Sequence, residues 1–229
     1  MLKTLQNAFK IKEIREKLLY TFFMLVVIRL GSQLPIPGVD TKFFAELFAR
    51  QSSDAFGFFN TITGGSFTNM SVFALSITPY ITSSIIMQLL TIAIPKLEEM
   101  QREGEDGRKK IAEYTRYLTV GLALMQSIAM SVGFGGRGLL IDFNAVSVIV
   151  AIATMTSGSA MLMWIGERIT ERGVGNGISI VLLFNIISTL PSDMITLYER
   201  FLVGKNVPVA TVSLIIILAI ILAMVVFVI

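Results

Sequence analysis

The 229-residue sequence contains no cysteine and no histidine, and only 15% of its residues are charged. These absences exclude a thiol nucleophile, a Ser-His catalytic pair, a disulfide, and any metal site built from His or Cys. Most hydrolytic and redox chemistry is therefore excluded, and we expect no metal site and no cofactor. The formal net charge of +3 is too small, and its charges are too segregated, to predict a nucleic-acid-binding surface.

Apolar residues, in contrast, make up 54% of the chain. A helix that crosses a membrane needs about 20 of them, because the hydrocarbon core is roughly 30 Å thick and a helix rises about 1.5 Å per residue. Buried helices of a large soluble core are the alternative, but no segment has a polar face of comparable length. We therefore predict an all-α integral membrane protein, a polytopic helical bundle. Its six candidate spans are 18–34, 71–94, 118–134, 145–165, 174–190 and 211–229, with Arg29 as their only charged residue.

The distribution of Lys and Arg predicts the orientation. Five, six and two of them lie in the expected N-terminal segment 1–17 and the loops 95–117 and 166–173, and six lie elsewhere, including the expected external loop 191–210. The positive-inside rule then places the N-terminus in the cytoplasm. We expect a retained first helix and no cleaved signal peptide, because the apolar run is long and no A-x-A-like site follows it. The 95–117 loop, which has mixed charge, is expected to be a hydrated connector or a docking surface.

The last five candidate spans contain no acidic or basic residue. Proton pumps, ion-coupled carriers and voltage sensors place such residues inside the membrane, because they move charge there. The pattern therefore favours a conduit or a scaffold.

Residues 55–69 do not fit a simple connector. They mix phenylalanines with Gly, Asn, Ser and Thr, and a helix of nine residues from Ala55 would cover only about 14 Å before Gly64 and Gly65 break it. A short helix leading into a long one predicts a re-entrant element, which requires a surrounding cavity. An amphipathic loop resting on the headgroups is the alternative, and the pattern alone does not decide.

Two further features concern helix starts. Gly173, Gly175 and Gly177 resemble a phosphate loop in glycine content, but they follow a polar turn and open an apolar span. We interpret them as a helix-start hinge that permits positive φ and close backbone approach. Pro79 is expected to mark either a kink or the first turn of a restarted helix.

Five motifs occur in one order along the chain: 29–40 (RLGSQLPIPGVD), 59–65 (FNTITGG), 77–90 (ITPYITSSIIMQLL), 105–117 (EDGRKKIAEYTRY) and 163–179 (MWIGERITERGVGNGIS). Together they resemble the bacterial SecY family of protein-conducting channels. The family has ten spans in two inverted halves, and the resemblance covers the first half plus the sixth helix. Because the chain ends inside an apolar run, we expect a fragment of a longer protein.

The resemblance implies a SecY-type half-channel with a plug and a pore ring. The plug is a half-helix that closes the pore and covers about 55–69, with Phe56, Phe58, Phe59, Asn60, Thr61, Ile62, Gly64 and Gly65. The ring is a collar of apolar side chains, here Ile77 and Ile81 from one span and Ile178 and Leu182 from another, each pair on one helical face. Without the resemblance, ordinary helix packing would explain these four residues.

The resemblance also implies a function. The chain would be part of the central pore-forming subunit of the Sec translocation channel, which passes unfolded secretory polypeptides across, and membrane segments laterally into, the bacterial plasma membrane. Spans 71–94 and 118–134 would form one wall of the lateral gate.

The implied partners are the SecE and SecG subunits, the SecA motor, the ribosome, signal-sequence-bearing polypeptides and lipid, with no direct nucleic-acid contact. No enzymatic activity is expected. The alternatives are half of a secondary transporter with a small-molecule site at the re-entrant segment, or an inert scaffold.

Overall fold

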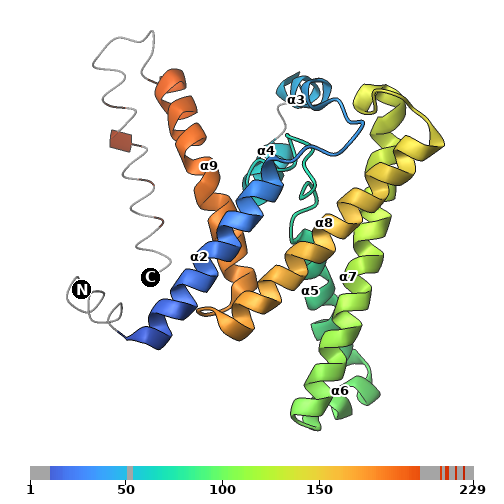
Figure 1. Ribbon diagram of the computed structural model, residues 1–229, viewed down its shortest axis with the longest axis vertical. Helices are drawn as coiled ribbons and strands as arrows, with labels where there is room; N and C mark the ends of the chain where they lie inside the picture. Colours follow the sequence, from blue (N-terminus) through green and yellow to red (C-terminus); the bar gives the residue numbers. More distant parts are fainter. Residues whose placement is uncertain are drawn as a thin grey trace. The chain divides into compact units, whose positions relative to one another are not determined.

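The computed structural model describes residues 11–50 and 54–201, together with residues 212, 215, 216, 220 and 224. These residues form helices and turns and no β-strand, which confirms the predicted all-α fold. The helices are α2 (Lys12–Gln33), α3 (Thr41–Arg50), α4 (Asp54–Ile62), α5 (Thr78–Ala93), α6 (Pro95–Arg102), α7 (Glu105–Phe134), α8 (Ala145–Arg172) and α9 (Gly177–Phe201), and a π-helical turn, η1 (Gly135–Leu139), follows α7 (Figure 1).

The chain divides into two compact units, Met1–Ile187 and Ser188–Ile229. The first unit contains α2 to α8 and the start of α9, and all packing described below lies within it. The second contains the rest of α9, with Pro191 inside the helix. Most of the predicted sixth span, 211–229, lies outside the described residues, as do residues 1–10 and 202–210 of the expected terminal segment and external loop.

Three helical segments of the described chain are long and apolar enough to cross a membrane: Glu105–Leu139, Ala145–Arg172 and Gly177–Thr196. α5 and α6 make a fourth candidate if they are taken together, although they meet at a bend of 101°. The predicted first span is helical, as α2, but Lys12, Glu13, Arg15, Glu16 and Lys17 occupy its first two turns. Because of these charges and Arg29, α2 is not among the segments that are apolar enough to cross a membrane.

The predicted span 71–94 is helical only from Thr78. Residues 63–77 form turns, and α5 begins with Pro79 in its first turn. Proline is tolerated there, because the N–H groups of the first turn have no hydrogen-bond partner within the helix. Residues 71–77 carry no charge, so their composition matches the apolar run, but Ser76 takes a positive φ of 52°, which a right-handed helix does not allow. Of the two expectations for Pro79, the first-turn position is the one observed.

The expected loop 95–117 is largely helical. α6 spans its first part, and α7 begins at Glu105. Two acidic residues in the first turn of α7 stabilise the helix, because they interact favourably with the positive end of its dipole. Gly104 connects the helices with a φ of 87°, and a Cβ at Gly107 would overlap the Met100 carbonyl. The segment is therefore a tight helical hairpin whose second arm continues into the predicted third span.

α8 packs against both α7 and α2, and α7 also packs against α5 (Figure 1). On α7 the buried positions recur every fourth residue and carry small side chains, which let helix backbones approach closely in a membrane protein. Ser127 of this stripe meets Thr156 of α8, with 2.9 Å between their hydroxyl oxygens. The stripe consists of Thr115, Thr119, Ala123, Ser127 and Ser131.

The segment after α2 ties three parts of the first unit together. Backbone hydrogen bonds run from Ile36 N to Met70 O (3.0 Å) and from Asp40 N to Leu139 O (2.8 Å). They cover a core cluster whose buried members include Phe44, Phe67 and Met70. A second core cluster joins α2, the turns that precede α5, α8 and α9, and consists of Ile28, Phe73, Ile77, Leu162, Ile165, Ile169 and Val181.

Candidate functional site

The short helix α4 is followed at once by a compact turn. Gly64 and Gly65 both take positive φ, 66° and 82°, a conformation that glycine adopts without steric cost. The Asn60 side chain closes the turn, because its Oδ1 accepts hydrogen bonds from the backbone N (3.3 Å) and the Oγ1 (2.9 Å) of Thr68. Thr63 donates in turn to the Asn60 carbonyl at 3.0 Å. The chain therefore folds back on itself after nine helical residues.

Arg29 of α2 holds this turn from outside. Its Nη1 donates to the Gly64 carbonyl oxygen at 2.9 Å, across 35 positions of sequence. In the sequence, Arg29 is distinguished as the single charge among the predicted spans. A lone charge in an apolar span is a signal for a specific partner. The sequence gives no indication that the partner is a backbone carbonyl of the turn.

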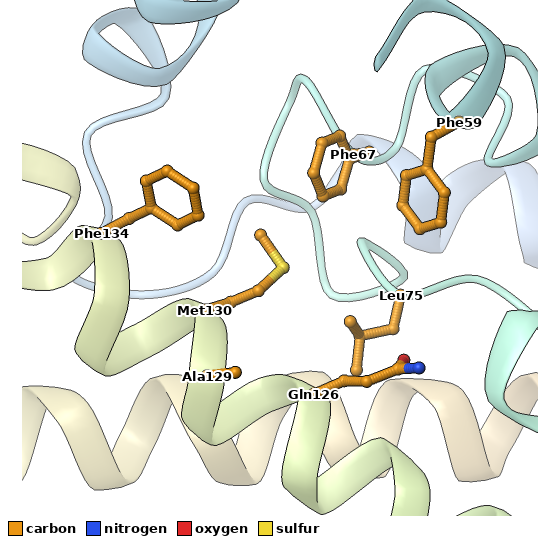
Figure 2. A pocket seen from close by; sticks show the side chains of 7 residues that line it. All are labelled: Phe59, Phe67, Leu75, Gln126, Ala129, Met130 and Phe134. Carbon is orange, nitrogen blue, oxygen red and sulfur yellow. The ribbon is translucent and has the colours of Figure 1, made fainter. Parts of the chain in front are cut away.

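An apolar pocket of about 370 Å³ lies beside the turn (Figure 2). Phe59 of α4 and Phe67 of the turn line one side and meet edge to face, with ring centroids 4.8 Å apart. Figure 2 shows Met130 and Phe134 of α7 on the opposite side, while Gln126 supplies the amide group. Leu75 and Ala129 complete the lining.

The remaining predicted plug residues of α4 differ in their exposure and contacts. Phe58 is 69% exposed and points away from the packed side of α4. The Thr61 hydroxyl donates to the Gly57 carbonyl within the helix, at 3.0 Å, and Ile62 is half-buried. Phe56 belongs to α4, but its side chain lies outside the described residues.

The four predicted ring residues come together where α5 and α9 begin. Ile81, Ile178 and Leu182 line one cavity of about 330 Å³, which Tyr80, Ser84, Ile85, Asn176 and Ser179 complete. Ile77 does not line it, because this side chain is fully buried in the second core cluster. A Cβ added to Gly166 of α8 would lie 3.2 Å from Ile178 Cγ1 and 3.5 Å from Ile77 Cδ1. Ile77 therefore supports the cavity wall from behind.

The three predicted hinge glycines have different geometries. Gly175 alone has a positive φ, 67°. A Cβ at Gly177 would overlap the Gly166 carbonyl oxygen, and one at Gly173 would lie 2.7 Å from the Ile169 carbonyl oxygen. Close approach thus requires glycine at two positions, and the backbone conformation favours it at the third.

Hydrogen bonds hold the turn between α8 and α9 at both ends. Val174 N donates to Thr21 Oγ1 of α2 (3.2 Å), and Gly177 N donates to Thr170 Oγ1 of α8 (2.9 Å). Asn176 caps α9, because its Oδ1 accepts from the N of Ile178 (3.1 Å) and of Ser179 (3.3 Å). The turn is therefore fixed at both ends.

These cavities offer little for chemistry on a substrate. Within the described residues, no group of three or more Asp or Glu could hold a metal ion. The α4 pocket is lined by apolar side chains apart from one amide, and the α5–α9 cavity combines isoleucine and leucine with hydroxyl and amide groups. Such surfaces suit contact with a chain or a seal against water.

Comparison with known proteins gives one family. The SecY family model matches residues 71–229. The protein translocase subunit SecY of Bacillus subtilis is 43% identical over 210 residues, which are 90% of this chain and 48% of that protein. The Pseudomonas aeruginosa subunit of the same name is 45% identical over 181 residues, 79% of this chain and 41% of that protein.

Solved structures give the same fold. Sec61 in a canine ribosome-channel complex matches with a TM-score of 0.54 at 20% identity, over 82% of this chain and 38% of that one. A structure described as a protein conducting channel matches equally well. The chain belongs to the SecY family and, with its apolar helices, is a membrane protein. It spans about half the length of the curated relatives it matches.

Proposed function

We propose that the chain forms half of a protein-conducting pore, as part of the central subunit of the Sec translocation channel. The pore passes unfolded secretory polypeptides across the bacterial plasma membrane and releases membrane segments sideways into lipid, with the chain's N-terminus in the cytoplasm. The observation that carries this proposal is that Ile81, Ile178 and Leu182 line the same cavity, near the N-terminal ends of α5 and α9.

In this proposal the ring residues seal the pore without binding the passing chain. Apolar side chains offer no hydrogen bonds to a polypeptide backbone, and a narrow apolar constriction excludes ions by dewetting when it is empty. Ile81, Ile178 and Leu182 would face the passing chain. The buried Ile77 would keep Ile81 and Ile178 in place, because it packs behind them beside Gly166.

The short helix α4 and its turn would act as the plug. Support comes from the kind of contacts that hold them: hydrogen bonds from Arg29 to Gly64 and from Ile36 to Met70, and phenylalanine contacts beside the α4 pocket. Moving the segment would break those contacts while leaving the α7–α8 packing intact. α5 and α7 would form one wall of the lateral gate.

The proposed partners follow from the same function. They are SecE, SecG and signal-sequence-bearing polypeptides, with SecA or the ribosome supplying the driving energy. One structural relative is a channel bound to a ribosome, which supports a partner of that kind. The chain itself would be a conduit and not an enzyme.

The proposal can be tested by ion leak in liposomes that contain the native gene product. Ile81→Asn should raise the resting leak several-fold, because a polar residue in the constriction keeps it wet. Leu89→Asn is the matched control, since Leu89 lies on the same helix, is 61% exposed and does not line the cavity. Equal leak from both variants would contradict the ring assignment. Uptake of a small solute without polypeptide transport would favour a transporter.

A further inference from the structure

Ser76, the residue immediately before Ile77, has an unusual backbone conformation. Its φ is 52°, and within the described chain only Met70 shares a positive φ without being glycine. The left-handed region is unfavourable for residues with a Cβ, because the Cβ approaches the following carbonyl oxygen. Ser76 is also buried, at 1% exposure. Its surroundings must therefore hold it in place.

Hydrogen bonds from two neighbouring helices keep Ser76 in this position. Asn185 of α9 donates from Nδ2 to the Ser76 hydroxyl oxygen at 3.1 Å, and Ser159 of α8 donates from its hydroxyl to the Ser76 carbonyl oxygen at 3.2 Å. Both donors are buried, at 6% and 1% exposure. The contacts span 109 and 83 positions of sequence, so they join three separate parts of the fold.

Ser76 lies immediately before the start of α5. Ile77 is the N-cap of α5, and its carbonyl oxygen accepts hydrogen bonds from the N of Tyr80 and of Ile81, each at 3.1 Å. On α9, Val181 lies one turn before Asn185 and packs in the same core cluster as Ile77. The contacts of Ser76 thus join the α5 side of the α5–α9 cavity to its α9 side.

We propose that Ser76, Asn185 and Ser159 form a buried clamp that fixes the start of α5 against α8 and α9. The clamp sets the resting spacing of the ring residues, and this part of the inference rests on the proposed function. The three are positioning residues: they act through Ile77 and Ile81 and do not contact a passing chain. Loss of the clamp lets Ser76 leave its left-handed conformation, and the start of α5 then moves away from α9.

The test uses the native gene product with Ile77→Cys, whose thiol is unique in this sequence. Ile77 is fully buried, so a water-soluble maleimide should label the thiol slowly in liposomes. Asn185→Leu and Ser76→Ala should each raise the labelling rate about tenfold, the effect of one lost buried hydrogen bond on an opening equilibrium. Ser127→Ala is the matched control, because it removes a hydroxyl contact between α7 and α8 away from the clamp.

A second pair of variants separates the clamp from simple packing. Glycine adopts a positive φ without strain, so Ser76→Gly should label more slowly than Ser76→Ala and should restore slow labelling when added to Asn185→Leu. If Ser76 only filled space, glycine would be the worse substitution. Labelling at the parent rate in Asn185→Leu, or faster labelling in Ser76→Gly than in Ser76→Ala, would overturn the clamp.

Ion leak then separates the clamp from the proposed function. Asn185→Leu should raise the leak, as Ile81→Asn does, and Ser76→Gly should reverse that increase. A leak that responds to Ile81→Asn but not to Asn185→Leu overturns the role of the clamp in the seal. If Ile81→Asn itself has no effect, the proposed function fails, and the labelling results alone decide whether the clamp exists.

Discussion

The α7–α8 pair and the segment from α4 through the turn at 63–77 are built in opposite ways. The first consists of two regular helices that pack through small residues recurring every fourth position. The second consists of nine helical residues and a run of turns, which hydrogen bonds from distant elements and the burial of Phe67, Met70 and Phe73 hold in place. The α7–α8 pair is a frame held by one repeated type of small-residue contact, whereas the candidate plug and the start of α5 are held by irregular contacts between residues far apart in the sequence.

The largest effect should come from breaking the contact between the frame and the turn. Gly158 of α8 lies against Val72, whose carbonyl oxygen a Cβ would overlap. Gly158→Ala should lower the free energy of unfolding by about 3 kcal/mol, because neither backbone can move easily. Gly121→Ala is the control, since open space surrounds Gly121 on α7 and alanine favours a helix. Thermal unfolding in detergent measures both, and equal shifts would refute the close contact.

The next effect should be confined to the turn. Arg29→Gln removes a charged hydrogen-bond donor to the Gly64 carbonyl, a contact of about 2 kcal/mol. Thr63→Cys provides the probe, because Thr63 is fully buried. Its labelling by a water-soluble thiol reagent should accelerate in the Arg29→Gln background, while the melting temperature changes little. A large drop in melting temperature without faster labelling would mean that Arg29 belongs to the frame.

A smaller effect is expected at the Asn60 side chain. Asn60→Ala removes both hydrogen bonds to Thr68 and should cost about 1 to 2 kcal/mol within the turn. Hydrogen exchange at the Thr68 amide should therefore become about tenfold faster. Thr61→Val serves as the control, because the Thr61 hydroxyl bonds only within α4 in the contacts described above. Unchanged exchange in Asn60→Ala would show that backbone contacts alone close the turn.

The smallest effect should come from the ion pair between the frame helices. Arg116 Nε of α7 and Glu167 Oε1 of α8 are 2.8 Å apart, with side chains 45% and 20% exposed. Arg116→Gln should cost about 0.5 kcal/mol, because solvent screens such pairs and the small-residue packing remains. About 1 M salt should remove most of the difference between variant and parent. A salt-independent loss of several degrees in melting temperature would make the pair an essential part of the frame.

What the sequence predicts follows the same division. Apolar length is a local property, so it predicted α7 from Leu118 onward, α8 and most of α9, and the glycine break predicted the short helix α4. Uncharged composition does not report backbone conformation, so the turn residues 71–77 were taken as part of a span. The segment 95–117 was expected to be a loop because it is highly charged. Charge does not exclude helix, and the segment forms α6 and the start of α7.

The long-range contacts had no sequence signal of their own. Arg29 was visible as a lone charge, but its partner is a backbone carbonyl 35 positions away. Ser76 and Asn185 look like ordinary polar residues of apolar segments, and only the fold brings them within 3.1 Å. The resemblance predicted four ring residues, of which three line one cavity and Ile77 lies behind it. Their role in a pore stays a prediction.

The most direct measurement of the central claim is photo-crosslinking of the native gene product to a secretory polypeptide arrested during transport. A photoreactive residue would replace Ile81, Leu182 or, as the control, Leu89 of α5, which is exposed and does not line the cavity. If the α5–α9 cavity is part of the pore, Ile81 and Leu182 crosslink to the arrested chain and Leu89 does not. Crosslinks from Leu89 alone, or equal yields from all three positions, would contradict the claim that this cavity contacts the translocating polypeptide.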